Sequence, residues 1–219
     1  MSMNSVVVNL IVLNVIMFAV KMYAAGSMFL DLDLLLGLHH PYSPEFSWYQ
    51  YITGIFMHGS FSHLLFNMLG LYIFGSMLER IWDARRFLLF YLVAGIGSSL
   101  IYQIWQSVAA YNYLQQFGDG LTLLMQNPPN SYLIGASGAV YGLLMGAALL
   151  FPNTEMYLFF FPGLPIKLKW MAIFYGGAEL LRAYQDNPAD NVAHFAHIGG
   201  MIFGFILIKV FNNDRSRFY

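Results

Sequence analysis

The sequence predicts an all-α polytopic membrane protein built as a bundle of six transmembrane helices. Hydrophobic residues make up 58% of the 219 residues and charged residues only 10%, well under half of the roughly 25% that soluble domains carry. Such a chain is too apolar to be disordered. Its apolar residues also gather in stretches of about 20, the length that crosses the hydrocarbon core of a bilayer. We therefore expect a single membrane domain over residues 1–219.

Six segments are apolar enough, or nearly so, to span the membrane. We interpret the first as a retained helix, because no small-residue cleavage site with polar flanks follows it. The fifth is the weakest, because Glu179 and Arg182 interrupt its outer part; since they are three residues apart, we expect them to form a structural pair. The expected helices cover residues 6–25, 52–78, 87–105, 132–151, 167–184 and 193–211.

Composition also excludes several kinds of function. A net charge of −1 supplies no basic field for nucleic acid. The absence of cysteine excludes disulfides, thiolate metal sites and a cysteine nucleophile. His39 and His40 are adjacent in the first loop, but without further ligands we expect no metal there, and no cofactor. Residues 107–131 are expected to form a long polar connection.

The distribution of Lys and Arg predicts the orientation, because these residues are retained on the cytoplasmic side. If the N-terminus is cytoplasmic, eight of the ten basic residues fall on that side, and the other side holds only Lys21 and Arg182. We therefore expect both termini in the cytoplasm and the second, fourth and sixth helices to run inward from the outer face. The eight are Arg80, Arg85, Arg86, Lys167, Lys169, Lys209, Arg215 and Arg217.

Three of these helices contain polar residues that are costly in a membrane. His63 and Asn67 are spaced i, i+4, which places both on one face of the second helix. At 1.5 Å per residue, Ser137 is expected roughly 8 Å into the fourth helix and His197 about 6 Å into the sixth. Both helices start from the outer face, so a serine, a histidine and two hydrogen-bond donors are expected to converge beneath it.

Glycines on the fourth and sixth helices would allow the serine and the histidine to come into contact. The fourth helix has a stripe with i, i+4, i+8 spacing and the sixth has a GxxxG pair, and small stripes let helix backbones approach closely. A serine hydroxyl must lie within about 3 Å of an imidazole to be activated by it. The stripe is Gly138, Gly142 and Gly146, and the pair is Gly200 and Gly204.

Each of these features also has a simpler interpretation. A run of small residues with one serine commonly serves close helix packing. A His-xxx-Asn pair more often forms hydrogen bonds that hold two helices together. A lone membrane histidine is typical of a proton relay as well as of a base. Only the conjunction of the three favours catalysis.

Together the motifs resemble the rhomboid family of intramembrane serine proteases, in its compact six-helix bacterial form. The match consists of His63-xxx-Asn67, Gly135-x-Ser137-Gly138 and His197-xx-Gly200-xxx-Gly204, in this order along the chain. The resemblance implies Ser137 as nucleophile, His197 as general base and His63 with Asn67 at the oxyanion hole. It also implies that Tyr141 packs on the histidine ring and that His58 helps to hold water. No acidic residue is expected beside His197, so we expect a Ser137–His197 dyad in which packing, in place of a carboxylate, orients the histidine.

The resemblance further implies a membrane endopeptidase that cuts transmembrane protein substrates, with an active site that opens to the extracytoplasmic side of the cell (inner) membrane. We expect the fifth helix to act as the substrate gate. Two other functions stay open: a non-catalytic rhomboid-like protein that binds client helices, and a small channel or transporter. Trp48-Tyr49-Gln50 departs from the Trp-Arg pair common in this loop of the family. The sequence leaves the oligomeric state open.

Overall fold

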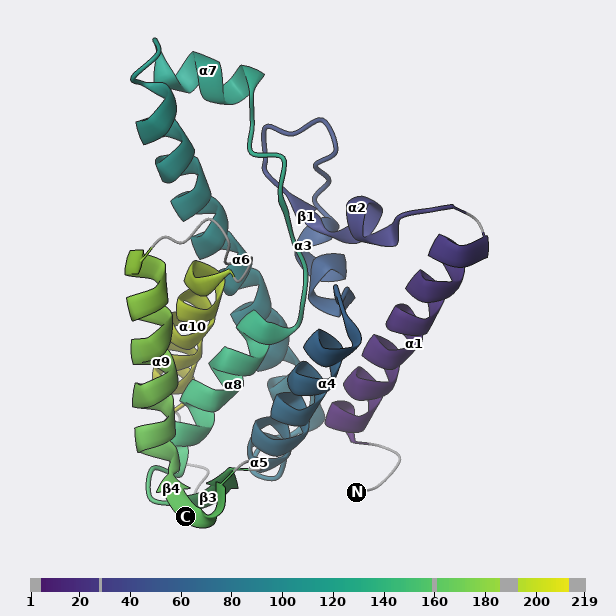
Figure 1. The fold of residues 1–219 in the computed structure, drawn as a ribbon. Helices are drawn as coiled ribbons and strands as arrows, with labels where there is room; N and C mark the ends of the chain where they lie inside the picture. Colours follow the sequence, from purple (N-terminus) through teal and green to yellow (C-terminus); the bar gives the residue numbers. More distant parts are fainter. Residues whose placement is uncertain (1–4, 28, 159–160, 186–192, 213–219) are drawn as a thin grey trace.

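The protein is a bundle of helices with two short two-stranded sheets at its ends (Figure 1). The computed structural model describes residues 5–27, 29–158, 161–185 and 193–212. Within these residues, four helices are long and apolar enough to cross a membrane, and Ser137–Leu150 is a shorter apolar helix. The four are Val6–Ser27, Phe61–Glu79, Ala84–Leu114 and His194–Phe211. Each of these helices overlaps one of the expected transmembrane segments, although several boundaries differ.

Helix α1 (Val6–Ser27) is held at its beginning by an acidic residue from another helix. Glu79, the last residue of α5 (Ser76–Glu79), accepts hydrogen bonds from the backbone N–H of Val6 and from the hydroxyl of Ser5, the latter at 2.6 Å. The first N–H groups of a helix have no partner within it, and its N-terminus favours negative charge. Glu79 satisfies both needs and ties α1 to the end of the second membrane segment.

The second membrane helix begins later than the predicted residue 52. A short α3 (Gln50–Thr53) and a 3₁₀ turn η1 (Gly54–Phe56) come first, and the helix proper starts with α4 (Phe61–Gly70). Ser60 is its N-cap and accepts a hydrogen bond from the backbone N–H of His63 at 3.1 Å. After α4 the helix continues through a π-helical turn, η2 (Leu71–Gly75), into α5. His63 therefore lies in the first turn rather than deep within a long helix.

Helix α6 (Ala84–Leu114) is considerably longer than the predicted 87–105. Asp83 caps its first turn by accepting a hydrogen bond from the N–H of Arg86 at 2.8 Å. Its 31 residues span about 46 Å, whereas the hydrocarbon core is about 30 Å thick. The helix therefore extends past the bundle, where α7 (Gly120–Gln126) follows it. The expected long polar connection over residues 107–131 is in large part helical.

The fourth membrane helix also begins later than predicted. Tyr132–Leu133 form strand β2, which pairs antiparallel with β1 (Leu38–His39), and α8 (Ser137–Leu150) starts at Ser137. The prediction of a helix from residue 132 was wrong, because a short apolar run does not distinguish a strand from a helix. Ser137 is thus the first residue of its helix and not a residue about 8 Å inside it.

The last two helices match their predicted ranges closely. A hairpin of β3 (Glu155–Leu158) and β4 (Phe161–Lys167) leads into α9 (Leu168–Gln185), and the described chain ends with α10 (His194–Asn212). Ile173 and Phe174 on α9, like Val12 and Ile16 on α1, are large apolar side chains that stay exposed. Exposed apolar surface of this extent is typical of helices that contact lipid.

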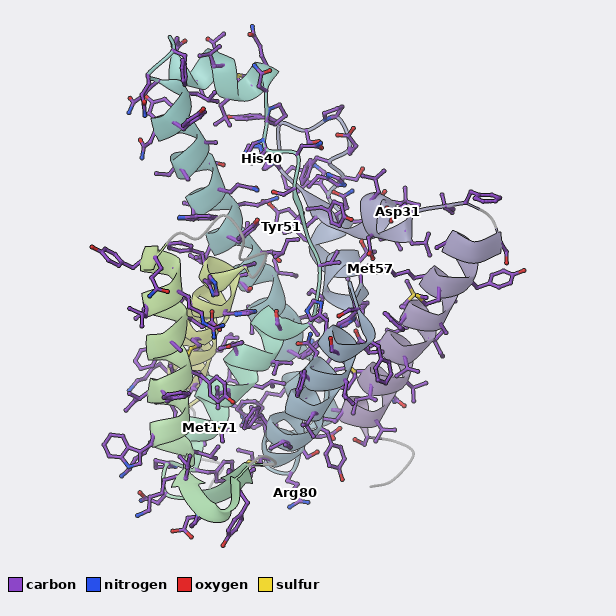
Figure 2. All side chains as sticks on the ribbon, viewed as in Figure 1. Asp31, His40, Tyr51, Met57, Arg80 and Met171 are labelled. Carbon is purple, nitrogen blue, oxygen red and sulfur yellow. The ribbon has the colours of Figure 1, made fainter. Side chains whose placement is uncertain are left out.

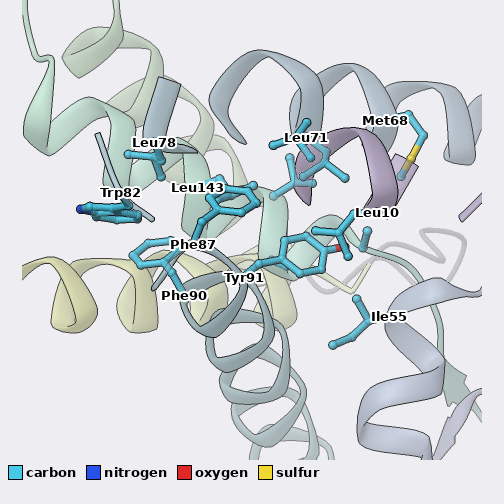
Figure 3. Close-up of a cluster of buried hydrophobic side chains, with 14 of the residues drawn as sticks. Leu10, Ile55, Met68, Leu71, Leu78, Trp82, Phe87, Phe90, Tyr91 and Leu143 are labelled. Atoms are coloured by element: carbon cyan, nitrogen blue, oxygen red, sulfur yellow. The ribbon is translucent and has the colours of Figure 1, made fainter. Parts of the chain in front are cut away.

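The main core packs aromatic residues of α6 against α1, α4–α5, α8 and α10 (Figure 3). Phe87, Phe90 and Tyr91 are fully buried, with Leu78 and Leu143 beside them. Each buried aromatic side chain removes a large area from solvent and dominates the packing. This core fixes the positions of α6 and α8 below the site described next.

The first loop contains two buried histidines, and one of them, His40, joins the loop to α6. Nε2 of His39 lies 2.7 Å from the backbone oxygen of Leu34, and Nε2 of His40 lies 2.8 Å from Oγ of Ser107. Burial lowers the pKa of His40, which favours its neutral form. Figure 2 shows His40 near the end of the molecule opposite Arg80. Both histidines thus have structural partners in this loop.

Candidate active site

Ser137 is presented by a sharp turn that only glycine fits. Gly135 has φ of +121°, in the region that side-chain-bearing residues rarely adopt. A Cβ at Gly135 would lie 2.7 Å from Nε2 of His63, so the histidine ring packs directly on the glycine backbone. The N–H of Gly135 donates to the carbonyl of Gly54 at 2.9 Å. The turn is therefore fixed from two sides, and it places Ser137 at the N-terminus of α8.

His197 on α10 meets Ser137 directly. Its Nε2 lies 2.8 Å from Oγ of Ser137, a normal hydrogen-bond distance. The ring of Tyr141, one turn further along α8, stacks on the imidazole with centroids 4.3 Å apart and planes at 9°. His197 is 8% exposed, so it is shielded from most of the solvent. This geometry suits proton transfer from the hydroxyl to the imidazole.

The close approach of α8 and α10 depends on glycines. A Cβ at Gly200 would lie 1.9 Å from the backbone oxygen of Gly138, and a Cβ at Gly204 would lie 2.5 Å from that of Gly142. No side chain fits at either position without moving a helix. The last glycine of the stripe, Gly146, faces side chains of Leu78, Phe90 and Ile208 instead of the α10 backbone.

His63 and Asn67 flank the same turn from α4. The N–H of Gly59 points at Nδ1 of His63 at 3.4 Å, an arrangement that assigns the ring proton to Nε2, the nitrogen facing Gly135. Nδ2 of Asn67 donates to the carbonyl of His63 at 2.9 Å and lies 3.9 Å from the position of a Cβ at Gly135. Both donors therefore lie beside the backbone that leads into Ser137.

His58 lies behind His63, with ring centroids 5.1 Å apart. It is fully buried, and neither of its ring nitrogens has a hydrogen-bond partner within the residues that the structure describes. A cavity of about 10 Å³ lies on the other side of the turn, lined by Ser98, Gly135, Ser137, Gly138 and Ala196 among others. That volume is on the order of one water molecule.

Glu179 of α9 is a site residue that the sequence interpretation missed. Its Oε1 lies 3.0 Å from Nδ1 of His197 and also accepts a hydrogen bond from the hydroxyl of Tyr141. Its Oε2 lies 2.5 Å from Nδ1 of His194. Two expectations were therefore wrong: an acidic residue does lie beside His197, and Glu179 is engaged with α8 and α10 rather than paired with Arg182. An acidic residue within a membrane helix was the available signal.

The cluster of Glu179, His194 and His197 also has the composition of a metal site. Each residue offers one ligand atom, and these atoms lie within 4.8 Å of one another. However, the contacts of 2.5 and 3.0 Å between carboxylate and imidazole are shorter than the roughly 3.3 Å between ligand atoms in a tetrahedral zinc site with bonds of about 2.0 Å. These distances fit direct contacts between the carboxylate and the two imidazoles better than joint coordination of a metal ion.

Comparison with known proteins finds several relatives that are named as rhomboids. The chain is 30% identical to RHOMBOID-like protein 12, mitochondrial, of Arabidopsis thaliana over 76% of this chain and 47% of that protein. It is 30% identical to Rhomboid protease GluP of Bacillus subtilis over 72% of this chain and 25% of that protein. With Rhomboid protease AarA of Providencia stuartii it shares 25% identity over 73% of this chain and 54% of that protein. The chain thus spans about half or less of the length of these relatives.

A family model also matches the chain. The Rhomboid domain covers residues 45–213, from the first loop to the end of α10. This range contains Ser137, His197, His63 and Asn67. Because the match covers well over half of the 219 residues, the protein is an integral membrane protein that belongs to the rhomboid family.

Proposed function

We propose that the protein is an intramembrane serine endopeptidase in which Ser137 is the nucleophile and His197 the general base. The observation that carries the proposal is the 2.8 Å contact between Oγ of Ser137 and Nε2 of His197 in a buried site. A serine hydroxyl is a weak nucleophile at its own pKa and needs an adjacent base.

The reaction can be followed atom by atom. Oγ of Ser137 attacks the peptide carbonyl carbon while its proton passes to Nε2 of His197, which then gives that proton to the departing amine nitrogen. Water then attacks the carbonyl carbon of the resulting ester while giving a proton to Nε2 of His197. The bond from that carbon to Oγ breaks, the carboxylic acid product leaves, and the proton passes from His197 to Oγ of Ser137. His197 thus serves as base and then as acid in each half of the reaction.

The turn before Ser137 is where negative charge would develop. Ser137 begins α8, and the first N–H groups of a helix are free of partners within it and favour an anion. Nε2 of His63 and Nδ2 of Asn67 face the same turn. In other enzymes, the loss of one such donor costs roughly 3–4 kcal/mol of transition-state stabilisation. We assign these groups to the oxyanion hole, with Gly135 and Gly138 as supporting residues and His58 near the entry of water.

We propose transmembrane segments of other proteins as substrates, because His63 and His197 lie on helices that are long and apolar enough to cross a membrane. In this arrangement six helices cross the bilayer, both termini are cytoplasmic and the site opens to the extracytoplasmic side of the cell (inner) membrane. Arg80 follows α5, and Arg85 and Arg86 lie in the first turn of α6. The α5 end of the bundle is away from the start of α8, which begins with Ser137 (Figure 1). That distribution supports the orientation.

Labelling with a fluorophosphonate probe tests the proposal. The natural protein, Ser137→Ala and His197→Ala would be purified in detergent and treated in parallel. We expect labelling of the natural protein alone. Ser107→Ala is the matched control, because its hydroxyl serves His40 outside the site, and it should label like the natural protein. Labelling that survives Ser137→Ala would contradict the proposal, because the reactive serine would then lie elsewhere.

A further inference from the structure

Glu179 is a buried carboxylate for which the reaction proposed above has no role. It is 5% exposed and lies on α9, next to two histidines of α10 and a tyrosine of α8. A carboxylate buried at this depth is costly unless charged or hydrogen-bonding partners surround it. A membrane protein without use for it would be expected to carry an apolar residue instead.

The contacts of Glu179 place it in line with the Ser137–His197 pair. Nε2 of His197 faces Oγ of Ser137, and Nδ1, on the opposite side of the ring, faces Oε1 of Glu179 at 3.0 Å. Nδ1 of His197 is buried, and within the part of the chain that the structure describes it makes this ion-pair contact and no hydrogen bond. Catalytic hydrogen bonds are often loose in a protein without substrate and tighten during the reaction.

The carboxylate itself is held from two other directions. The hydroxyl of Tyr141 donates to Oε1, and the same tyrosine stacks on the His197 ring. Nδ1 of His194 contacts Oε2 at 2.5 Å. Glu179 is therefore fixed from α8 and α10, so that its remaining interaction is directed at His197.

We propose that Glu179 is a positioning residue that completes a Ser137–His197–Glu179 relay. This inference rests on the proposed function. A carboxylate at Nδ1 holds the ring proton there and leaves Nε2 free to accept the serine proton. It also stabilises the imidazolium that forms when the proton arrives, and it stays ionised throughout. In this protein the ring of Tyr141 and the carboxylate of Glu179 orient the histidine together.

The test is the rate of fluorophosphonate labelling of the full-length protein in detergent with a chelator present. Glu179→Gln keeps the shape of the side chain but removes its charge. We expect the maximal labelling rate to fall about 10- to 100-fold while the half-saturating probe concentration stays the same. Glu179→Asp should recover part of the rate. Glu155→Gln, the same change at an exposed carboxylate of β3, is the matched control and should have no effect.

The pH profile separates positioning from a merely structural role. A nearby carboxylate favours the protonated imidazole, so its removal should move the acid limb of the labelling rate to lower pH. A structural defect would reduce the folded fraction and leave that limb in place. The ionisable or polar groups around His197 are Ser137 and Tyr141 of α8, Glu179 of α9, His194 of α10 and His63 of α4.

A second measurement does not depend on a substituted Glu179. In the natural protein, nitrogen NMR of the histidine rings should find the proton of His197 on Nδ1, with the signal assigned by its loss in His197→Ala. A proton on Nε2, or equal labelling rates and pH profiles for Glu179→Gln and Glu155→Gln, would overturn the inference and leave the proposed function intact. If the natural protein is not labelled at all, the proposed function fails and the inference fails with it.

Discussion

At the scale of single residues, Gly135 holds a conformation that other residues adopt only at a cost. Its φ is +121°, and a Cβ would lie 2.7 Å from the His63 ring. Gly135→Ala should therefore lose about 1–3 kcal/mol of stability through backbone strain alone. It should also push His63 away from the turn and slow fluorophosphonate labelling. Thermal unfolding in detergent and the labelling rate measure the two effects.

Gly177 of α9 provides the control for that substitution. No heavy atom lies within 4 Å of the position of its Cβ, and it lies within a helix. Gly177→Ala should therefore leave stability unchanged or raise it by up to about 1 kcal/mol. If both variants melt at the same temperature as the natural protein, the strain assigned to Gly135 is wrong.

The sequence pointed to Ser137, His197, His63 and Asn67 because each belongs to a short motif with local spacing. The surroundings of Glu179 follow no such pattern. It is 38 residues from Tyr141 and 15 from His194 along the chain. Its partners are set by how α9 packs on α8 and α10, and Arg182, three residues away, offered a more obvious pairing. Long-range contacts of this kind become visible only in the folded protein.

At the scale of elements, the contact between α8 and α10 brings the two reacting groups together. Gly200→Ala would place a Cβ 1.9 Å from a backbone oxygen, so the helices must separate. We expect a loss of about 1–3 kcal/mol, the range for an overpacked core. A displacement of about 1 Å at the Ser137–His197 contact should slow labelling by roughly 100-fold. Melting temperature and labelling rate are measured on the same preparation.

Gly26→Ala is the matched control for Gly200→Ala, because no heavy atom lies within 4 Å of its Cβ position in α1. It should melt and label like the natural protein. Normal labelling by Gly200→Ala would mean that the two helices can separate without loss of the site, contrary to the packing argument.

Hydropathy predicted where the helices lie but misplaced two of their beginnings. Residues 52–60 and 132–136 are as apolar as the helices they precede, so composition alone extends both helices outward. Local residue types mark the true helix beginnings: Ser60 is the N-cap of α4, and Gly135 lies just before the start of α8. The consequence is functional, because both helix beginnings face the same turn instead of lying deep in the bundle.

At the scale of the whole molecule, the long helix α6 joins the basic end of the bundle to the opposite end. Arg85 lies in its first turn, and Gln116 lies two residues beyond its last residue, Leu114; both are exposed. Because the chain has no cysteine, a single cysteine can be placed at either position without background. In spheroplasts, a membrane-impermeant maleimide should label Gln116→Cys and not Arg85→Cys. Lysis should expose both.

The reverse pattern would contradict the proposed orientation while leaving the site unchanged. Labelling of both variants before lysis would mean that α6 does not separate two compartments. Only the reverse pattern would move the proposed opening of the site away from the extracytoplasmic side, since α8, which begins with Ser137, starts on the side of the bundle where α7 lies (Figure 1).

The position of Glu179 on α9 has a consequence for how a substrate helix could enter. If α9 swings outward as a gate, as the sequence analysis supposed, it carries the carboxylate away from His197, Tyr141 and His194 together. With α9 open, the enzyme would then be inactive. Only the closing of α9 around a bound segment would restore the Ser137–His197–Glu179 relay. Substrate entry and catalysis would require different positions of α9 and could not occur at the same moment. Membrane proteins that contact the opening only briefly would therefore not be cleaved.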